Sequence, residues 1–394
     1  MPALPRITAI NIKGYRPFRD FNAPLGPLEV FVGANGSGKS SLFQFLRFLR
    51  DGMRSEIPPE IIPDTIGGQI FHKPGPDKFS WAVEIAMESS DAISYAGELL
   101  GPVGRPQVSG ESVRSAQPIE RNTIVGDIYN PYMSRVSGTL VIYDPNGKGP
   151  TPEIDAGRPN DLVLRSITLS NLPVLYNLRQ FIKGWAFYSG FNIAEEKMRK
   201  PVLVQQEPAL HEDCGNISSV LHYFKTEHAE IFEEVQCHLR SVIPGFQKLD
   251  VYVRGGPGQV VAFWWEQGVG DMTLADLSEG ILRFLCWCVL CLHPAPPPLI
   301  CIDEPELGVH PRTLPVLAGL LEKASDRTQI LMATHSSYFL TQFDVSRIAV
   351  MRKEDGEAKF YKPKDSAVLE GFLEDFGPEE VAVLHRSDEL EQLT

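Results

Sequence analysis

Long apolar runs are missing from this sequence. Runs such as Phe284–Leu292 fall well short of the roughly 20 apolar residues that a membrane-spanning helix needs. The start of the chain also lacks the apolar stretch of a signal peptide, because basic residues interrupt it. These residues are Arg6, Lys13, Arg16 and Arg19. We therefore expect a cytoplasmic protein without a membrane partner.

Cysteines are few, and their spacing does not suggest a metal site. The 394 residues contain six cysteines, and no C-x-x-C pair recurs at the spacing of a zinc site. Cys286, Cys288 and Cys291 fall in one apolar, helix-like run, and Cys301 falls in a strand-like run. We interpret these residues as small buried thiols rather than metal ligands.

Positive charge is scarce over the chain as a whole. The formal net charge of −13 argues against a protein that coats nucleic acid over its entire surface. Residues 1–50 nevertheless carry seven basic residues against two acidic ones, whereas residues 364–394 carry two against nine. These counts are compatible with a basic groove on one part of the surface. With 43% hydrophobic and 22% charged residues, the composition is that of a globular protein of two or three domains.

A phosphate-binding loop is present at Gly33–Ser40, which reads GANGSGKS and matches G-x-x-x-x-G-K-[S/T]. A strand-like run at residues 28–32 precedes it, and an amphipathic helical pattern at 41–50 follows it. A bound phosphate would therefore meet a helix N-terminus. Lys39 would contact the β- and γ-phosphates, and the Ser40 hydroxyl would join a Mg²⁺ shell. Further nucleotide contacts are predicted for Asn35, Gly36, Ser37, Gly38 and Ser41.

Two acids end a second strand-like run. Leu299–Glu304 is apolar until Asp303 and Glu304, and acids are uncommon at the end of a buried strand unless a cation meets them. Asp303 is suited to the Mg²⁺ shell, and Glu304 is suited to orient or deprotonate an attacking water. A further apolar run, 330–335, ends in His335. If both strands are parallel, His335 lies at the same sheet edge and can contact the γ-phosphate or the water.

Three further candidates for the site each have two interpretations. Ser278 and Gly280, in Leu277–Arg283, begin a helix that would bind an anion or would simply be capped by Ser278. Arg16 faces a nucleotide or is a solvated turn arginine. Gln69 is a ligand of metal or water, or an ordinary loop residue.

Four motifs occur in an order that resembles ABC-type ATPases. They correspond to Walker A, the signature, Walker B with D-loop, and the switch histidine, and the match is closest to the soluble SMC/RecF-like branch, the predicted AAA-type ATPases related to the OLD and Septu ATPase subunits. In this chain they are Gly33–Ser40, Leu277–Gly280, Ile302–Glu306 and Ala333–Ser336. The resemblance also covers Pro305–Pro311 and Asp213–Leu221.

This resemblance implies an α/β fold, an ABC-type P-loop ATPase head with a mixed sheet and an α+β or helical insertion between Walker A and the signature. The implied division is 1–88 for the N-terminal lobe, 89–240 for the insertion or lid, and 241–394 for the C-terminal lobe. Residues from about 89 to 157 shift toward Pro, Gly, Ser and Asn, which is typical of an insertion.

The resemblance further implies ATP and Mg²⁺ as cofactors and a head-to-tail ATP-sandwich homodimer. Ser278 and Gly280 of one subunit would close on the γ-phosphate bound at Lys39 of the other. Arg16 would contact the nucleotide, and Gln69 would occupy the Q-loop position. Glu279 stands where transporter ATPases usually carry Gly, and no heptads occur between Lys39 and Ser278, which argues against a transporter subunit and a long-armed SMC. We also expect no C-terminal Toprim nuclease.

The function expected from the sequence is ATP hydrolysis whose dimer cycle controls DNA or an effector protein such as a nuclease or toxin. The resemblance alone suggests anti-phage defence, and it leaves assembly beyond a dimer open. Two alternatives stay open as well. One is a low-turnover, ATP-gated scaffold that holds or releases a toxin or nuclease, and the other is a RecF-type DNA-repair ATPase with salt-dependent DNA binding.

Overall fold

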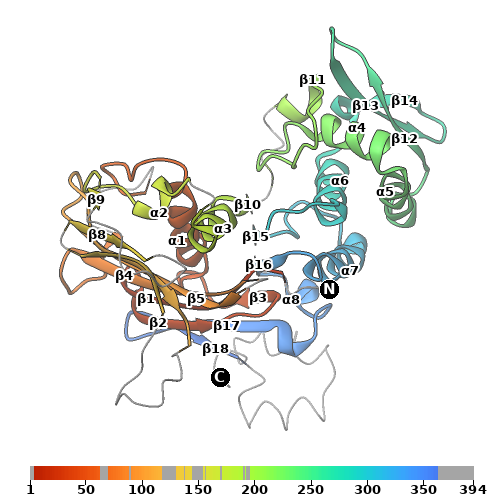
Figure 1. Ribbon diagram of the computed structural model, residues 1–394. Coiled ribbons are helices and arrows are strands. Elements are labelled where there is room, and N and C mark those ends of the chain that lie inside the picture. The colour runs from red at the N-terminus through yellow and green to blue at the C-terminus, as the bar shows by residue number, and fades with distance from the viewer. Residues whose placement is uncertain are drawn as a thin grey trace. The chain divides into compact units, whose positions relative to one another are not determined.

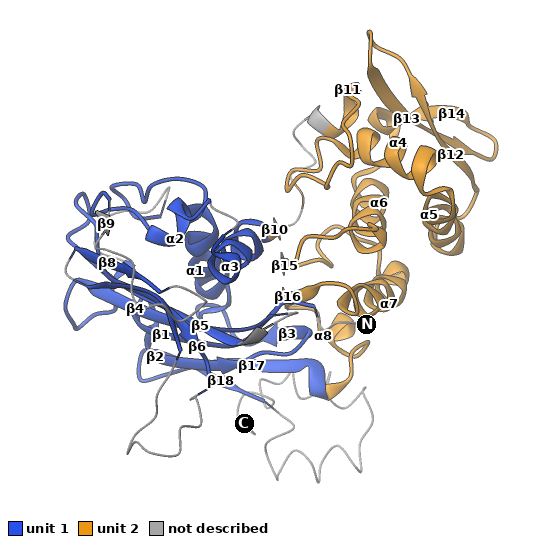
Figure 2. Cartoon of the chain, in the orientation of Figure 1, with its two compact units in different colours: residues 1–185, 346–374, 388–394 blue, residues 186–345, 375–387 orange. Residues whose placement is uncertain are grey.

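The computed structural model describes residues 4–62, 70–87, 90–117, 130–136, 138–143, 154–155, 157–168, 171–189, 191 and 196–362 (Figure 1). The chain forms two compact units (Figure 2). The described parts of residues 1–185 and 346–362 belong to unit 1, and those of 186–345 belong to unit 2. The boundaries at residues 88 and 240 that the sequence suggests do not coincide with this division, and they stay a prediction.

Unit 1 contains a long antiparallel sheet. Its eight described strands run in the order β2-β1-β4-β5-β6-β7-β8-β9. They are β1 (Arg6–Tyr15), β2 (Phe18–Pro24), β4 (Lys78–Met87), β5 (Ser90–Leu100), β6 (Gln107–Ser115), β7 (Pro131–Val136), β8 (Thr139–Ile142) and β9 (Ile154–Asp155). Strands β5 to β9, from the predicted insertion, extend the sheet of β1 and β4, because β5 pairs with β4 along its length.

A second set of strands in unit 1 carries the phosphate loop. β3 (Leu28–Val32) is fully buried and pairs in parallel with β17 (Ile348–Glu354), which pairs antiparallel with β18 (Glu357–Tyr361). Helix α1 (Lys39–Gly52) follows the loop and buries an apolar stripe that includes Leu42, Phe45 and Leu49. Helices α2 (Val163–Ser166) and α3 (Pro173–Lys183) complete the unit, and α3 lies beside α1. The predicted strand, loop and helix order is confirmed.

A buried acid ties α2 to the sheet of unit 1. Glu111 on β6 is 2% exposed and accepts hydrogen bonds from Tyr95 Oη at 3.0 Å, from Val163 N at 2.5 Å and from Leu164 N at 3.1 Å. Burial is the largest effect on this carboxyl and raises its pKa from 4.5 to about 7, although the two backbone donors, Tyr95 and the nearby Arg135 act in the opposite direction.

We expect Glu111→Gln to remove a pH dependence of stability. The pKa is higher in the folded than in the unfolded chain, so the stabilising contribution of the protonated carboxyl is complete below about 4.5 and is lost as the pH rises through about 7. The free energy of unfolding of the variant, relative to wild type, should therefore rise by about 2 kcal/mol between pH 5 and pH 8. Urea unfolding at both pH values measures this difference. An unchanged difference would show that burial does not govern this carboxyl.

Unit 2 contains three parallel strands and the helices that pack near them. β10 (Ala186–Ser189), β15 (Leu299–Asp303) and β16 (Gln329–Ala333) lie side by side in that order. Helices α6 (Glu279–Leu292) and α7 (Leu314–Ser325) pack against each other, and α8 (Ser337–Leu340) follows β16. The 3-10 helices of the described chain are η2 (Glu196–Arg199), η3 (Leu274–Asp276), η4 (Pro311–Thr313) and η5 (Val345–Arg347). Cys286, Cys288, Cys291 and Cys301 are buried, as predicted.

A small antiparallel sheet forms the other part of unit 2. It is built from β11 (Val202–Leu203), β12 (Phe246–Val253), β13 (Gln259–Glu266) and β14 (Gly270–Thr273), and β12 pairs only with β13 among the described strands. Helices α4 (Ile217–Glu227) and α5 (Ala229–Val242) pack on it. The two helices are separated at His228, which takes a non-helical conformation with φ −137°.

Helix side chains bond the outer backbone groups of β12. Gln236 Oε1 on α5 accepts from Leu249 N at 3.0 Å, and Lys225 Nζ on α4 donates to Val251 O at 3.1 Å. Lys225 also contacts Asp250, whose pKa is well below its usual range because hydrogen bonds from Lys225 and Lys248 outweigh its burial.

None of the described helices is long and apolar enough to span a bilayer.

Candidate functional site

The phosphate loop of unit 1 has the backbone of an anion site. Gly33, Gly36 and Gly38 have φ of +145°, +81° and +112°, conformations that side chains rarely allow. Gly38 is the N-cap of α1, no side chain caps this helix, and no acid lies in its first turn. The first N–H groups of α1 and its dipole therefore favour a bound anion at this end.

Lys39 is folded into the loop. Its Nζ donates to Gly33 O at 2.6 Å, to Ala34 O at 3.1 Å and to Ser37 Oγ at 3.4 Å. Lys39 is 6% exposed and Ser37 is 1% exposed. These partners are uncharged, so a phosphate would be a stronger acceptor for the same ammonium group. Among the other predicted contacts, Asn35, Gly36 and Ser40 are exposed and Ser41 is half-buried.

Arg16 has side-chain partners on α1 and at the end of β1. It lies in a left-handed turn, with φ 46°, between β1 and β2, and it is half-buried. Its guanidinium donates to Gln44 Oε1 on α1 and lies 5.8 Å from the centre of the Tyr15 ring. Arg16 is thus a turn arginine whose side chain also contacts α1, and its contact with a nucleotide stays a prediction. Gln69 lies outside the described residues, and its role also stays a prediction.

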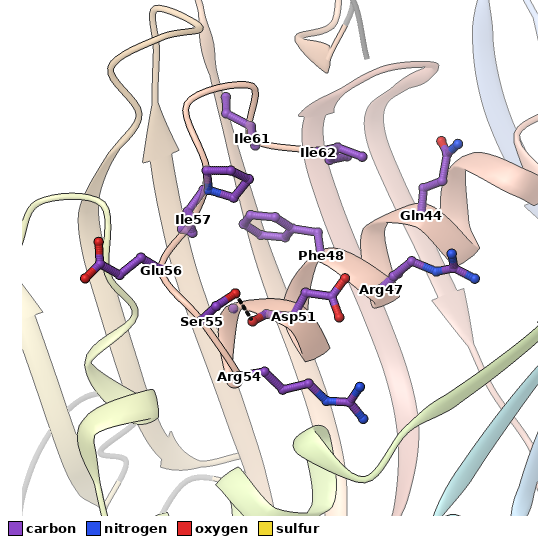
Figure 3. A pocket seen from close by; sticks show the side chains of 12 residues that line it. Gln44, Arg47, Phe48, Asp51, Arg54, Ser55, Glu56, Ile57, Ile61 and Ile62 are labelled. Carbon is purple, nitrogen blue, oxygen red and sulfur yellow. Dashed lines mark hydrogen bonds between the residues drawn. The ribbon is translucent and has the colours of Figure 1, made fainter. Parts of the chain in front are cut away.

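A pocket of about 410 Å³ lies along α1 in unit 1 (Figure 3). Its floor is apolar and includes Phe48, Ile57 and Ile61, and charged side chains such as Arg47 and Asp51 lie around it. Gln44, the partner of Arg16, also lines this pocket. No residue of the loop 33–41 lines it, so the pocket is distinct from the phosphate loop.

The acids and the histidine of unit 2 lie at one sheet edge. β15 and β16 are parallel, and Asp303 is in register with Ala333. The chain therefore leaves both strands at the same end, with Glu304 after one and His335 after the other, as the sequence suggested. Asp303 and Glu304 are half-buried, and His335 is exposed. Their chemical roles stay predictions.

Glu304 has an unusual backbone conformation. Its φ of 53° is in the left-handed region, which costs a non-glycine residue about 1 kcal/mol. A hydrogen bond from Glu304 N to Ala333 O, 2.9 Å long, holds this conformation against β16. Such strain in a residue next to an acid at a strand end is typical of functional sites.

Glu306 is a contact residue that the sequence reasoning did not select. Its Oε1 accepts from Thr334 Oγ1 at 2.7 Å, from His335 N at 3.1 Å and from Ser336 N at 3.2 Å. In the sequence, Glu306 is the last residue of the Walker B match Ile302–Glu306, two residues after Glu304, and nothing local gives it a separate role. Hydrogen bonds between segments 30 residues apart are not visible in a local pattern.

The signature segment begins helix α6. Ser278 is its N-cap, and Ser278 Oγ accepts from Ile281 N at 3.4 Å, so the capping role left open above is confirmed. At Gly280, a Cβ atom would lie 3.0 Å from Gly308 O. Arg283 Nη1 donates to Leu307 O at 3.1 Å. The start of α6 therefore packs against the segment that follows Glu306, and nucleotide contact by Ser278 and Gly280 stays a prediction.

Two sequence families match parts of the chain. Residues 6–94 match a family described as "AAA ATPase domain", and residues 153–341 match one described as "AAA domain, putative AbiEii toxin, Type IV TA system". A search of curated protein sequences found no significant match.

Solved structures resemble most of the chain. One is an SMC head bound to the C-terminal winged-helix domain of ScpA, with a TM-score of 0.56 at 14% identity over 90% of this chain and 97% of that chain. Another is an SMC head from Pyrococcus furiosus with an extended coiled coil, bound to the C-terminal domain of ScpA. It has a TM-score of 0.53 at 13% identity over 94% of this chain and 100% of that chain. At these identities the likeness concerns the fold.

Proposed function

We propose that this chain, whose fold is similar to that of SMC heads and which matches AAA ATPase families over residues 6–94 and 153–341, binds ATP with Mg²⁺ and hydrolyses it to ADP and phosphate. The predicted fold class, an α/β ATPase head, is confirmed, whereas the grouping with OLD and Septu subunits stays a prediction. The proposal rests on two groups of residues in one chain, which we call half-sites. The first is the phosphate loop Gly33–Ser40 at the N-terminus of α1, which no side chain caps. The second is Asp303 and Glu304 with His335, at one edge of the parallel strands β15 and β16.

The first half-site binds the triphosphate. Lys39 leaves its loop carbonyl partners for the phosphates, and the N–H groups of α1 and its flanking glycines surround them. Asn35, Gly36 and Ser40 are on the exposed side of the loop, where a ligand can reach them. Arg16, which Gln44 holds beside α1, contacts the nucleotide.

The second half-site acts on the attacking water. Glu304 orients and deprotonates the water, and His335 donates a hydrogen bond to a γ-phosphate oxygen or contacts the attacking water. The oxygen donors Ser40 and Asp303, with Gln69, are of the type that Mg²⁺ prefers, since this ion takes hydroxyl, carboxylate and carbonyl oxygens. When bound, Mg²⁺ supplies charge that stabilises the developing negative charge on the phosphates.

We further propose a head-to-tail homodimer as the state that hydrolyses ATP. Ser278 and Gly280 of one subunit then close on the γ-phosphate bound at Lys39 of the other, and opening and closing is the output. A nuclease or toxin is the proposed effector, with DNA as the alternative partner. The toxin–antitoxin description of one matching family and the ScpA complexes of the similar SMC heads support a protein partner. The same family description supports a role in anti-phage defence.

Purified wild-type protein tests this function directly. We expect saturable ATP binding that requires Mg²⁺ in calorimetry, steady-state phosphate release, and an ATP-dependent shift from monomer to dimer in sedimentation. Failure to bind ATP with Mg²⁺ would overturn the proposal. Binding without dimer formation would retain the nucleotide site and remove the sandwich.

A further inference from the structure

The carboxylate of Glu306 connects the segment after β15 to the segment after β16. Three donors from consecutive residues, Thr334 Oγ1, His335 N and Ser336 N, converge on the single atom Oε1 at 2.7 to 3.2 Å. Thr334 is fully buried, and Oε2 of Glu306 is buried as well. A carboxylate that accepts several hydrogen bonds in a buried place holds its donors more firmly than a neutral acceptor would.

The segment bearing His335 is held from its other side too. Ser336 is the N-cap of α8, and its Oγ accepts from Phe339 N at 3.1 Å. The backbone of His335 is therefore fixed between the Glu306 carboxylate and the start of α8, while its ring remains exposed. A ring that must meet a phosphate or a water needs a fixed backbone of this kind, because small displacements of a reacting group are costly.

Glu306 itself is held by the turn that it belongs to. Leu307 N donates to Glu304 O and Val309 N donates to Glu306 O, both at 3.1 Å. The left-handed backbone of Glu304 starts this turn, and its N–H is bonded to β16. Glu304 and His335 are therefore joined twice, once through the backbone and once through the Glu306 side chain.

The same turn reaches the start of α6. Leu307 O accepts from Arg283 on α6, and Gly308, with φ 71°, lies directly beside Gly280. A methyl group at Gly280 would lie 3.0 Å from Gly308 O, so there is little room for the two segments to slide past each other. The turn and the N-terminus of α6 are therefore in direct contact.

We propose that Glu306 is a positioning residue for ATP hydrolysis, which sets the place of His335 relative to Glu304 and links both to the signature helix. This inference rests on the proposed ATPase function. Glu306 acts through the 334–336 segment and does not itself bind nucleotide. Its removal should therefore lower kcat and leave the affinity for ATP nearly unchanged.

The test compares Glu306→Ala with Glu306→Gln. Alanine removes all three hydrogen bonds, and we expect kcat to fall between 10- and 100-fold while the Kd for ATP changes less than about threefold. Glutamine keeps one acceptor oxygen of the same reach, and kcat should stay within about fivefold of wild type. Equal loss in both variants, or a parallel rise in Kd, would overturn the inference.

A double-mutant cycle separates positioning from general damage. If Glu306 acts through His335, then Glu306→Ala combined with His335→Ala should be no slower than His335→Ala alone, and multiplying losses would contradict this. Should Glu306→Ala fail to fold, Thr334→Val replaces it, because it removes one of the three donors with little change of shape. We expect a three- to tenfold lower kcat for that variant, and an unchanged kcat would count against the role.

A readout without ATP distinguishes this inference from the function it rests on. The amide of His335 should exchange with solvent at least tenfold faster in Glu306→Ala than in wild type, and Glu306→Gln should retain most of the protection. If wild type does not hydrolyse ATP but the exchange pattern appears, the proposed ATPase function is wrong, whereas Glu306 does hold the backbone of His335. If the exchange rates are equal, Glu306 does not hold this backbone, whatever the ATPase activity.

Discussion

Replacing Glu304 by glutamine is expected to lower steady-state phosphate release by about 100-fold or more while ATP binding is retained. Glutamine has nearly the same shape as glutamate but cannot take a proton from water. The left-handed backbone at Glu304 and its hydrogen bond to Ala333 O involve main-chain atoms only, so the variant keeps this geometry. Because binding continues and hydrolysis stops, the ATP-bound dimer should accumulate.

Phosphate release and sedimentation with ATP and Mg²⁺ measure this prediction. Glu322→Gln is a matched control, since the same acid-to-amide change is made on the exposed side of α7 in the same unit, and its rate should equal that of wild type. If wild-type protein is no faster than Glu304→Gln, ATP is turned over too slowly to matter, and the alternative of an ATP-gated scaffold gains support.

The second large effect is expected for Gly33→Ala, at the start of the phosphate loop. A Cβ atom there would lie 2.0 Å from Met351 O on β17 and 3.0 Å from Ser37 Oγ, and φ is +145°. Met351 O is a backbone atom of a buried strand, so the chain cannot move aside without disturbing the pairing of β3 with β17. We expect the free energy of unfolding to fall by about 4 kcal/mol or more.

Gly36→Ala provides the comparison within the same loop. Gly36 also has a positive φ, of +81°, but no atom lies within 4 Å of a Cβ atom built there. The backbone conformation alone should then cost about 1 kcal/mol. Urea unfolding of the nucleotide-free proteins separates the two variants. Similar losses in both would show that backbone conformation, and not contact with Met351, makes Gly33 necessary.

Local patterns predicted the elements whose evidence is local. The loop at Gly33–Ser40, the strand before it and the helix after it follow each other directly in the chain, so periodicity and turn residues reveal them. The two strands that end in Asp303 and in Ala333 were equally visible as short apolar runs. Their alignment at one edge followed from the rule that neighbouring parallel strands point the same way.

Features that depend on distant partners were not predicted. Residues from about 89 to 157 were interpreted as an insertion, and the pairing of β5 and β6 within it with the antiparallel sheet of unit 1 was not foreseen. The composition of a segment shows that it is rich in turn residues, but it does not show which strand the segment pairs with. Glu306 was missed for a similar reason, since its function is visible only when Thr334 and His335 are placed beside it. The break at His228 has no proline or glycine to reveal it.

The bonded outer margin of β12 also limits how unit 2 can meet other proteins. Exposed strand margins recruit further strands, which leads to strand exchange between copies or to fibrils. At β12 the amide of Leu249 and the carbonyl of Val251 are already used by Gln236 and Lys225. An incoming strand would have to displace these side chains to bond Leu249 N and Val251 O. The two helices therefore protect the β12 margin of this sheet at these two positions.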